Sequence, residues 1–255
     1  MLHIHFKVLI VATTCLSGAF ALPGPLRLAS TFSEITTELQ HITLGNCSLK
    51  DVELPINDTK VKLPEPSPHL DLKYVVIGRG TQNYSCNFGE SVHHPKKSST
   101  PKATGAVATL FDASCIASQS SSLLHEFPAI MGHTTLGSLA FLAETLALST
   151  KTSNLIIGEH YFNAAGDPFF DLRLSGSDTW IVSKKDASVN APTRRSQPFG
   201  KEGSDVPWLK LDCKDCKGVK EVYRVMTVDG VAPSTCDGQN DAVLVDYAAE
   251  YWFYG

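Results

Sequence analysis

The sequence predicts a mainly β protein, an antiparallel β-sandwich or β-barrel that carries a short helical insertion. At least eight short segments are rich in β-branched and aromatic residues, and polar turn sequences separate them. One region, near residues 117–153, places leucine at helical spacing, and a weaker helical pattern lies around Phe32 to Leu39. Strand and helix patterns do not alternate along the chain, so a parallel sheet with crossover helices is not expected.

The first 21 residues have the pattern of a secretory signal peptide. Lys7 precedes the apolar run Val8–Cys15, and Ala19-Phe20-Ala21 supplies the small residues that signal peptidase recognises. We therefore expect cleavage after Ala21 and a secreted, extracellular protein, with association to the cell wall as one option. No other apolar run approaches the ~18 residues of a transmembrane helix, so no membrane span is expected.

The charge balance argues against nucleic acid as a partner. Loss of residues 1–21 removes Lys7 alone, which leaves 21 basic and 26 acidic residues. A mildly acidic chain lacks the basic surface that binds phosphate backbones or anionic membranes. The expected partner is an extracellular ligand, and carbohydrate is one candidate class.

The segments before the helical insertion predict an arm and two strands. Residues 22–45 form an N-terminal arm, and a single β-rich domain is expected to span 46–255. Prolines interrupt the apolar pieces of residues 46–70, which is typical of edge strands or extended arms. Strands follow at 73–86 and at about 105–112.

The helical insertion and the strands after it complete the predicted domain. Leu139, Leu142 and Leu146 recur at helical intervals, so one or two short helices are expected to pack this stripe on the core. Strand patterns then return in the remaining apolar segments, which are 154–162, 169–174, 178–185, 207–213, 219–228 and 242–254.

The stretch VVIGRGTQNYSC, residues 75–86, begins like a dinucleotide-binding loop. That fingerprint needs a third glycine three positions after the second, at the start of a helix. Asn83 occupies this position, and Tyr84 continues a strand pattern. Gly78 and Gly80 are instead expected to permit a bulge or a sharp bend in a curved strand. No nucleotide or other cofactor is expected.

Six cysteines remain once Cys15 leaves with the signal peptide, and an even number in an exported chain predicts disulfides. We expect three bridges, Cys86–Cys115, Cys47–Cys236 and Cys213–Cys216. The first would join the ends of consecutive strands, the second would tie the arm to the last loop, and the third would staple a hairpin turn. The CxxC spacing of the third pair has no matching second pair, so a zinc site is not expected.

Three sequons predict N-glycosylation, at Asn46, Asn57 and Asn83. A single sequon is common by chance. Three of them beside a signal peptide agree with passage through a eukaryotic secretory route.

His160 is the first candidate for a catalytic residue. It lies in a strand pattern beside Glu159 and near Asp171. Histidine can act as a base, and carboxylates can orient it or bind a metal, although a lone histidine in a strand is more often structural. The chain has neither the GxSxG nor the HExxH motif, and no metal site is expected.

Arg224 and Glu250 are the candidates for a buried polar or binding site. Each interrupts a row of apolar or aromatic residues on one face of a predicted strand. An unpaired charge there would be costly, so we expect the two side chains to pair between antiparallel neighbours. Two alternatives stay open. Both charges could point to solvent, or Arg224 could bind an anion in a pocket with Glu250 beside it.

Several blocks together resemble a family of secreted proteins of unknown function that is widespread in fungi and has shorter bacterial relatives. The blocks include GRGTQNYSC at 78–86, GAVATLFDASC at 105–115 and YAAEYWFYG at 247–255. The resemblance covers about residues 46–255, and it implies an exported, mostly β domain without catalytic residues to carry over. The long leucine-rich insertion and the Cys213/Cys216 pair depart from the family pattern.

The resemblance leaves the activity open. Members of the family are sometimes labelled malate dehydrogenase, but the missing fingerprint and the secretion signal disfavour that activity here. The first hypothesis is a disulfide-stabilised domain that binds a ligand at the cell surface or wall. The second is an extracellular hydrolase or lyase that uses His160 with Asp171 or Glu159.

Overall fold

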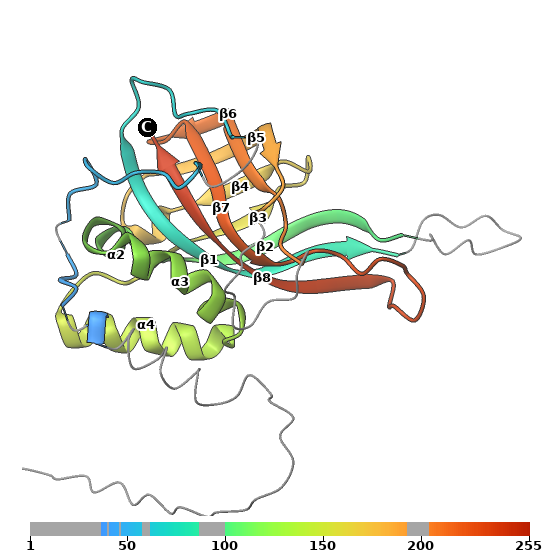
Figure 1. Ribbon diagram of the computed structural model, residues 1–255, viewed down its shortest axis with the longest axis horizontal. Helices are drawn as coiled ribbons and strands as arrows, with labels where there is room; N and C mark the ends of the chain where they lie inside the picture. The colour runs from blue at the N-terminus through green and yellow to red at the C-terminus, as the bar shows by residue number, and fades with distance from the viewer. Residues whose placement is uncertain (1–36, 40, 46, 58–61, 87–99, 193–203) are drawn as a thin grey trace, which may run out of the picture.

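The computed structural model describes residues 37–39, 41–45, 47–57, 62–86, 100–192 and 204–255. Eight antiparallel strands follow chain order around a closed barrel, which the pairing of the first and last strands completes (Figure 1). The strands are β1 (Leu72–Ser85), β2 (Lys102–Asp112), β3 (Ile156–Phe162), β4 (Pro168–Asp171), β5 (Trp180–Val189), β6 (Trp208–Lys217), β7 (Glu221–Asp229) and β8 (Ala242–Tyr254). The predicted antiparallel β class is confirmed, and of its two alternatives the protein is the barrel.

Three helices lie together on one side of the barrel (Figure 1). They are α2 (Ser114–Gln119), α3 (Ser121–Gly132) and α4 (Leu136–Thr150), and a single 3-10 turn, η1 (Arg173–Ser175), follows β4. The predicted helical insertion is confirmed, although three helices form where one or two were expected. The hydroxyls of Ser120 and Thr135 cap α3 and α4 by accepting backbone N–H groups of the first turn.

No helix in the described part of the chain combines the length and the apolar character needed to cross a membrane.

The wall formed by β7, β8 and β1 is buried on both faces. Tyr247, Tyr251 and Phe253 of β8 point inward and belong to the core inside the barrel. Ala248 and Trp252 point outward into a second core, which they share with side chains of α3. Because both faces are covered, every residue from 247 to 254 is buried, and all of them except Glu250 are apolar or aromatic.

Gly78 and Gly80 allow close packing in β1 and do not form the predicted bulge. The pairing of β1 with β2 is continuous from Val76 to Asn83. A Cβ atom at Gly78 would lie 2.6 Å from the Tyr251 ring, and one at Gly80 would lie 1.8 Å from the Val107 carbonyl oxygen. Glycine is therefore required where an aromatic ring and a neighbouring backbone approach the curved strand (Figure 1).

The helix α4 buries a different row of residues from the predicted leucine stripe. Leu139, Ala143 and Ala147 face the core. Leu142 and Leu146 are 58% and 39% exposed, so the prediction that they pack on the core was wrong. Residues spaced by four also line one face of a helix, and the two alanines let the helix backbone approach its neighbours more closely.

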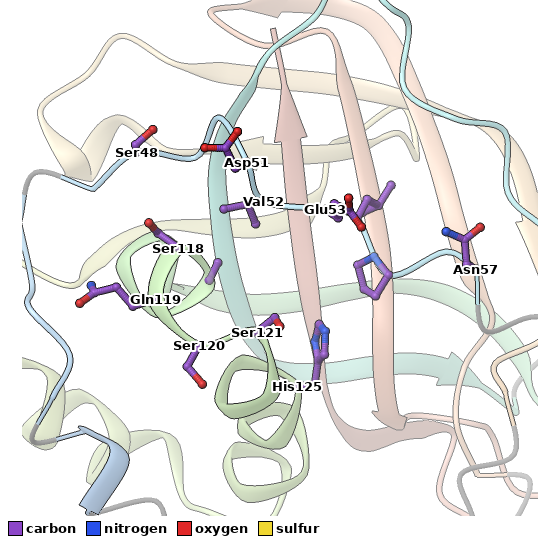
Figure 2. Close-up of a pocket in the computed structure, with 13 residues that line it drawn as sticks. Ser48, Asp51, Val52, Glu53, Asn57, Ser118, Gln119, Ser120, Ser121 and His125 are labelled. Carbon is purple, nitrogen blue, oxygen red and sulfur yellow. The ribbon is translucent and has the colours of Figure 1, made fainter.

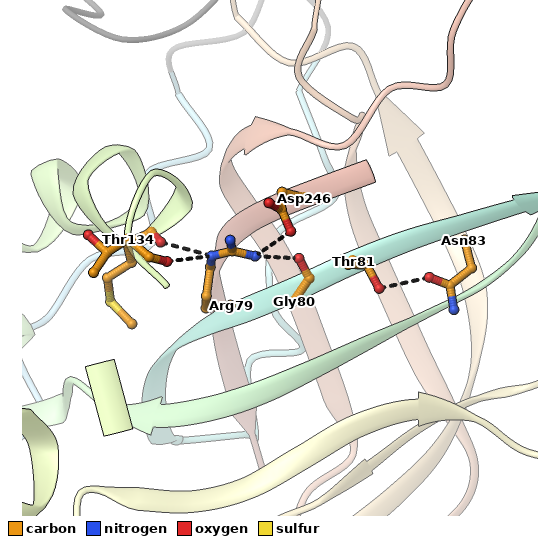
Figure 3. A network of polar contacts seen from close by, with 7 residues as sticks. Arg79, Gly80, Thr81, Asn83, Thr134 and Asp246 are labelled. Atoms are coloured by element: carbon orange, nitrogen blue, oxygen red, sulfur yellow. Dashed lines mark hydrogen bonds and ion pairs between the residues drawn. The ribbon is translucent and has the colours of Figure 1, made fainter. Parts of the chain in front are cut away.

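Arg79 joins the outer face of β1 to the junction of α3 and α4 (Figure 3). Its guanidinium donates hydrogen bonds to the carbonyl oxygens of Met131 at 2.9 Å, Thr134 at 3.3 Å and Gly80 at 2.7 Å. It also pairs with Asp246 at 3.1 Å. These acceptors include a carboxylate, so they compensate the burial of the charge and tie the helices to β1 and β8.

Three disulfides form, but two of the predicted pairings were wrong. Cys86 pairs with Cys236, and Cys47 pairs with Cys115, in place of Cys86–Cys115 and Cys47–Cys236. Because β1 is antiparallel to β8, the residue after β1 meets the loop that precedes β8. Cys115 lies in α2, where it holds the N-terminal segment.

The Cys213–Cys216 bridge is confirmed. Both cysteines lie within β6 and not in a hairpin turn. The bridge spans the point at which the pairing of β6 with β5 shifts its register. The bridge therefore cross-links two residues on either side of an irregularity in β6.

Loss of the Cys86–Cys236 bridge should destabilise the protein more than loss of Cys213–Cys216. The two bridges join residues 150 and 3 positions apart. On the chain-entropy account the longer loop contributes about 5 kcal/mol and the shorter about 2 kcal/mol. Urea unfolding of the two Cys→Ser double variants measures the difference, and non-reducing peptide mapping checks the pairs. Equal losses, or a peptide that joins Cys86 to Cys115, would contradict this prediction.

Candidate functional site

His160 and its two candidate carboxylates lie on opposite faces of the sheet. In the β3–β4 pair, Phe170 is opposite His160 and Asp171 is opposite Glu159. Opposed residues share a face, so His160 points into the barrel while both carboxylates point outward. Arg173 Nε donates a hydrogen bond of 2.8 Å to Asp171 Oδ1. This hydrogen bond lowers the pKa of the Asp171 carboxyl. The fold therefore does not bring His160 together with Glu159 or Asp171, and the predicted catalytic arrangement does not form.

The His160 imidazole is packed among aromatic rings. It is 3% exposed and stacks on Phe170, with ring centroids 4.1 Å apart. Its Nδ1 lies 2.9 Å from the Phe169 carbonyl oxygen, so this nitrogen carries the proton and donates. Burial lowers the pKa of His160 to about 4, and the hydrogen bond to Phe169 opposes this shift only in part. The ring is therefore neutral at physiological pH, as expected of a structural histidine.

Arg224 and Glu250 do not pair, and neither points to solvent. In the β7–β8 pair, Arg224 is opposite Tyr251, and Glu250 is opposite Val225. Arg224 therefore points into the barrel, whereas Glu250 points outward beneath α3. The predicted ion pair was wrong because alternation along each strand does not set the register between strands, and a shift of one residue exchanges the faces.

Glu250 is fully buried and has two partners on the outer face. Its Oε1 lies 2.8 Å from His125 Nδ1, and its Oε2 accepts a hydrogen bond from Trp252 Nε1 at 3.0 Å. The Glu250 side chain is 0% exposed, whereas the His125 side chain is 24% exposed. The carboxylate thus orients the imidazole of His125 and leaves its Nε2 free of this contact.

His125 lines a polar groove between the N-terminal segment and the helices (Figure 2). The groove has a volume of about 630 Å³. One wall is formed by the segment that follows Cys47, and the other by the end of α2 and the start of α3. The lining residues are Ser48, Asp51, Val52, Glu53, Leu54, Pro55, Asn57, Ala117, Ser118, Gln119, Ser120, Ser121 and His125.

The N-terminal wall is attached to α2 at one end. The Cys47–Cys115 disulfide joins the two covalently. Gln119 also exchanges hydrogen bonds with Thr43, donating from Nε2 to its carbonyl oxygen at 2.8 Å and accepting its N–H at 2.9 Å. These links hold the segment although it pairs with no strand of the barrel.

The groove offers hydroxyl, amide, carboxylate and imidazole groups. None of the described residues that line it is lysine or arginine, so it carries acidic side chains without basic ones. Within the described ranges, no group of three or more histidine, cysteine, aspartate or glutamate residues has an arrangement that could hold a metal ion.

A comparison with known protein families matches residues 66–255 to the family described as protein of unknown function, DUF3455. The chain belongs to the DUF3455 family. A comparison with curated proteins and one with solved structures found no match. The DUF3455 region includes the helices and Glu250, whereas the groove residues 48–57 precede it. The groove is thus built partly from the family domain and partly from a segment outside it.

His125 is a site residue that the sequence did not reveal. It lies in a segment of the DUF3455 region whose leucine pattern predicts only a helix packed on the core, and it is 125 residues from Glu250. The available signal was the charge of Glu250 in an apolar strand, which requires a partner. That signal was assigned to Arg224 because the helix that covers β8 could not be placed from the sequence.

The candidate glycosylation sites differ in exposure. Asn57 is exposed and lies at the edge of the groove, and Asn83 is half-buried in β1. Asn46 lies outside the described residues.

His160 should make the folded protein less stable in acid. The unfolded chain takes up this proton near pH 6.5, while the folded state resists it until about pH 4. Stability is therefore unaffected above pH 6.5 and falls between pH 6.5 and 4, by up to about 3 kcal/mol. Urea unfolding at pH 7 and pH 4 should show that the wild type loses more stability than His160→Gln. Parallel pH profiles of the two proteins would refute the assignment.

His125 and Glu250 should be energetically coupled. A double-mutant cycle with His125→Ala and Glu250→Gln should give a coupling energy of about 1–2 kcal/mol, because one partner is buried and the other is partly exposed. The more exposed pair Arg173–Asp171 serves as the control and should give a smaller coupling energy, because solvent screens it. Additive losses at His125 and Glu250 would show that the contact does not orient the imidazole.

Proposed function

We propose that the protein is an exported, N-glycosylated binding protein that holds a neutral, hydroxyl-rich ligand of the carbohydrate class in the polar groove. Export is supported by the signal pattern of residues 1–21 and by three disulfides, which persist in oxidising compartments. Glycosylation is supported by three sequons, and the acceptor residue of one of them, Asn57, is exposed. Polysaccharides of a cell surface or wall would supply such a ligand outside the cell.

The His125–Glu250 pair is the observation that carries this proposal. A fully buried carboxylate is costly unless its oxygens are satisfied, and here they hold His125 and Trp252. The imidazole is thereby fixed at the groove before any ligand arrives. A fixed polar group loses little conformational entropy on binding, so its hydrogen bond contributes more to affinity.

The remaining polar groups fit hydroxyls better than ionic groups. A sugar hydroxyl both donates and accepts, so it can bind the carboxylates of Asp51 and Glu53 as well as serine hydroxyls such as Ser118. An anionic ligand would meet these two carboxylates without a basic side chain to neutralise it. The groove therefore favours a neutral ligand.

An extracellular hydrolase is the second candidate, and the same histidine favours it. An imidazole oriented by a carboxylate is the usual base for activating a hydroxyl nucleophile or water. Ser121 precedes His125 by one helical turn of α3, so both lie on one side of that helix. The enzyme would then use His125 in place of His160.

A glycan array and thermal-shift measurements with neutral oligosaccharides should identify the ligand of the groove. His125→Gln should weaken binding about tenfold or more, the equivalent of one lost hydrogen bond. Asp51→Asn should also weaken it. His133→Gln is the matched control, because His133 is exposed at the other end of α3 and should leave affinity unchanged.

Two results would overturn the binding proposal. One is the absence of any oligosaccharide that raises the melting temperature of the wild type. The other is a ligand whose affinity is the same in the wild type, His125→Gln and Asp51→Asn. Hydrolysis of an ester substrate by the wild type, lost in Ser121→Ala and His125→Gln, would identify the hydrolase instead.

A further inference from the structure

The buried charges of the barrel differ in how they are neutralised. On the outer face Arg79 pairs with Asp246 at 3.1 Å, and Glu250 contacts His125 at 2.8 Å. Lys210 and Glu221 pair with each other at 3.6 Å. Arg224 is equally buried, with 9% of its surface exposed, yet no carboxylate of the described residues pairs with it. It is the exception among the buried cations.

The guanidinium of Arg224 is held inside the barrel by neutral groups. Its Nη2 and Nε donate to the carbonyl oxygen of Pro207, at 2.8 and 3.3 Å. It also interacts with the hydroxyl of Tyr251. A carbonyl and a phenol satisfy some of its five N–H groups, but neither neutralises its charge.

Hydroxyl and amide groups lie near Arg224 inside the barrel. The Tyr251 and Tyr247 hydroxyls lie 3.0 Å apart and share one hydrogen bond. Gln82 lies beside Tyr247, and its Nε2 is buried without a hydrogen-bond partner among the described residues. His160 also lies in this interior, but its Nδ1 is committed to a backbone carbonyl. The interior of the barrel thus places groups that can donate hydrogen bonds near a buried cation.

A buried arginine cannot relieve its charge by losing a proton, because its pKa is too high. Burial of an uncompensated charge costs several kcal/mol. An anion that entered the barrel would neutralise this charge. Eight-stranded barrels are wide enough to hold either their own side chains or one small ligand.

We propose that Arg224 anchors an anion-binding site inside the barrel, and that its ligand is the carboxylate of a small organic acid. The planar guanidinium matches the two oxygens of a carboxylate, and Tyr251 and Gln82 are positioned as further donors along the same interior. The aromatic rings of Phe170 and Tyr251 would contact the apolar part of the acid.

This site is separate from the polar groove. Arg224 and Tyr251 face the interior, whereas Glu250 faces α3 on the other side of the same wall. The groove carries acidic groups and favours neutral ligands, while the interior carries a cation that pairs with no carboxylate of the described residues. A negative binding result at one site therefore does not bear on the proposal for the other.

Thermal shifts of the secreted protein in acetate, benzoate, inorganic phosphate and chloride, at constant ionic strength and pH 7, test the proposal. The carboxylates should raise the melting temperature saturably, by about 3–6 °C at ten times Kd, relative to chloride. Arg224→Met should abolish this rise. Arg79→Met is the matched control, since Arg79 is as buried but has a carboxylate partner, and it should keep the response.

A spectroscopic measurement keeps the test decisive if Arg224→Met fails to fold. In the wild type, carboxylate should shift the NMR signal of one arginine Nε–H group, and Arg224→Lys identifies that signal as Arg224. Three results would overturn the proposal. They are a carboxylate response no larger than that of chloride, an equal response in Arg224→Met, and stabilisation by phosphate without stabilisation by either carboxylate.

Discussion

The pairing of β1 with β8 is the interaction on which the rest of the structure depends. It runs from Leu72 opposite Tyr254 to Ser85 opposite Ala242, and it closes the barrel across the whole length of the domain. Its register places the Tyr251 ring against Gly78, where only glycine leaves room. The same register brings the end of β1 to the loop that carries Cys236, so the longest-range disulfide follows from strand pairing.

The helical insertion gives this closed wall a second buried face. The outer face of a small barrel is usually exposed to solvent, but α3 covers β7, β8 and β1 and excludes water from their outer side chains. Two polar environments then lie on opposite faces of the wall formed by β7, β8 and β1. Glu250 and Arg79 are matched by partners from the helices or the sheet, whereas Arg224 is surrounded by rings and neutral oxygens. Residues of one wall thus face two different polar environments.

The secondary structure could be predicted from local sequence patterns, whereas contacts between distant segments could not. The strands and the helical insertion follow from composition and spacing, because β-branched and aromatic residues fit a pleated surface and leucine recurs on a helix. Barrel closure, the partners of Cys86 and the faces of Arg224 and Glu250 depend on contacts between distant segments. His125 was overlooked because only the docking of α3 on β8 reveals its partner.

The N-terminal wall of the groove is held in two ways. Residues 48–57 contribute no strand; a disulfide and a pair of hydrogen bonds anchor the preceding residues Cys47 and Thr43 to α2, and Leu54 and Ile56 are buried in the core outside the barrel. Reduction of Cys47–Cys115 would therefore free the start of this wall, near Ser48, while Leu54 and Ile56 keep its other end on the core. The oxidation state of the chain thus affects one end of the groove, whereas apolar packing holds the other.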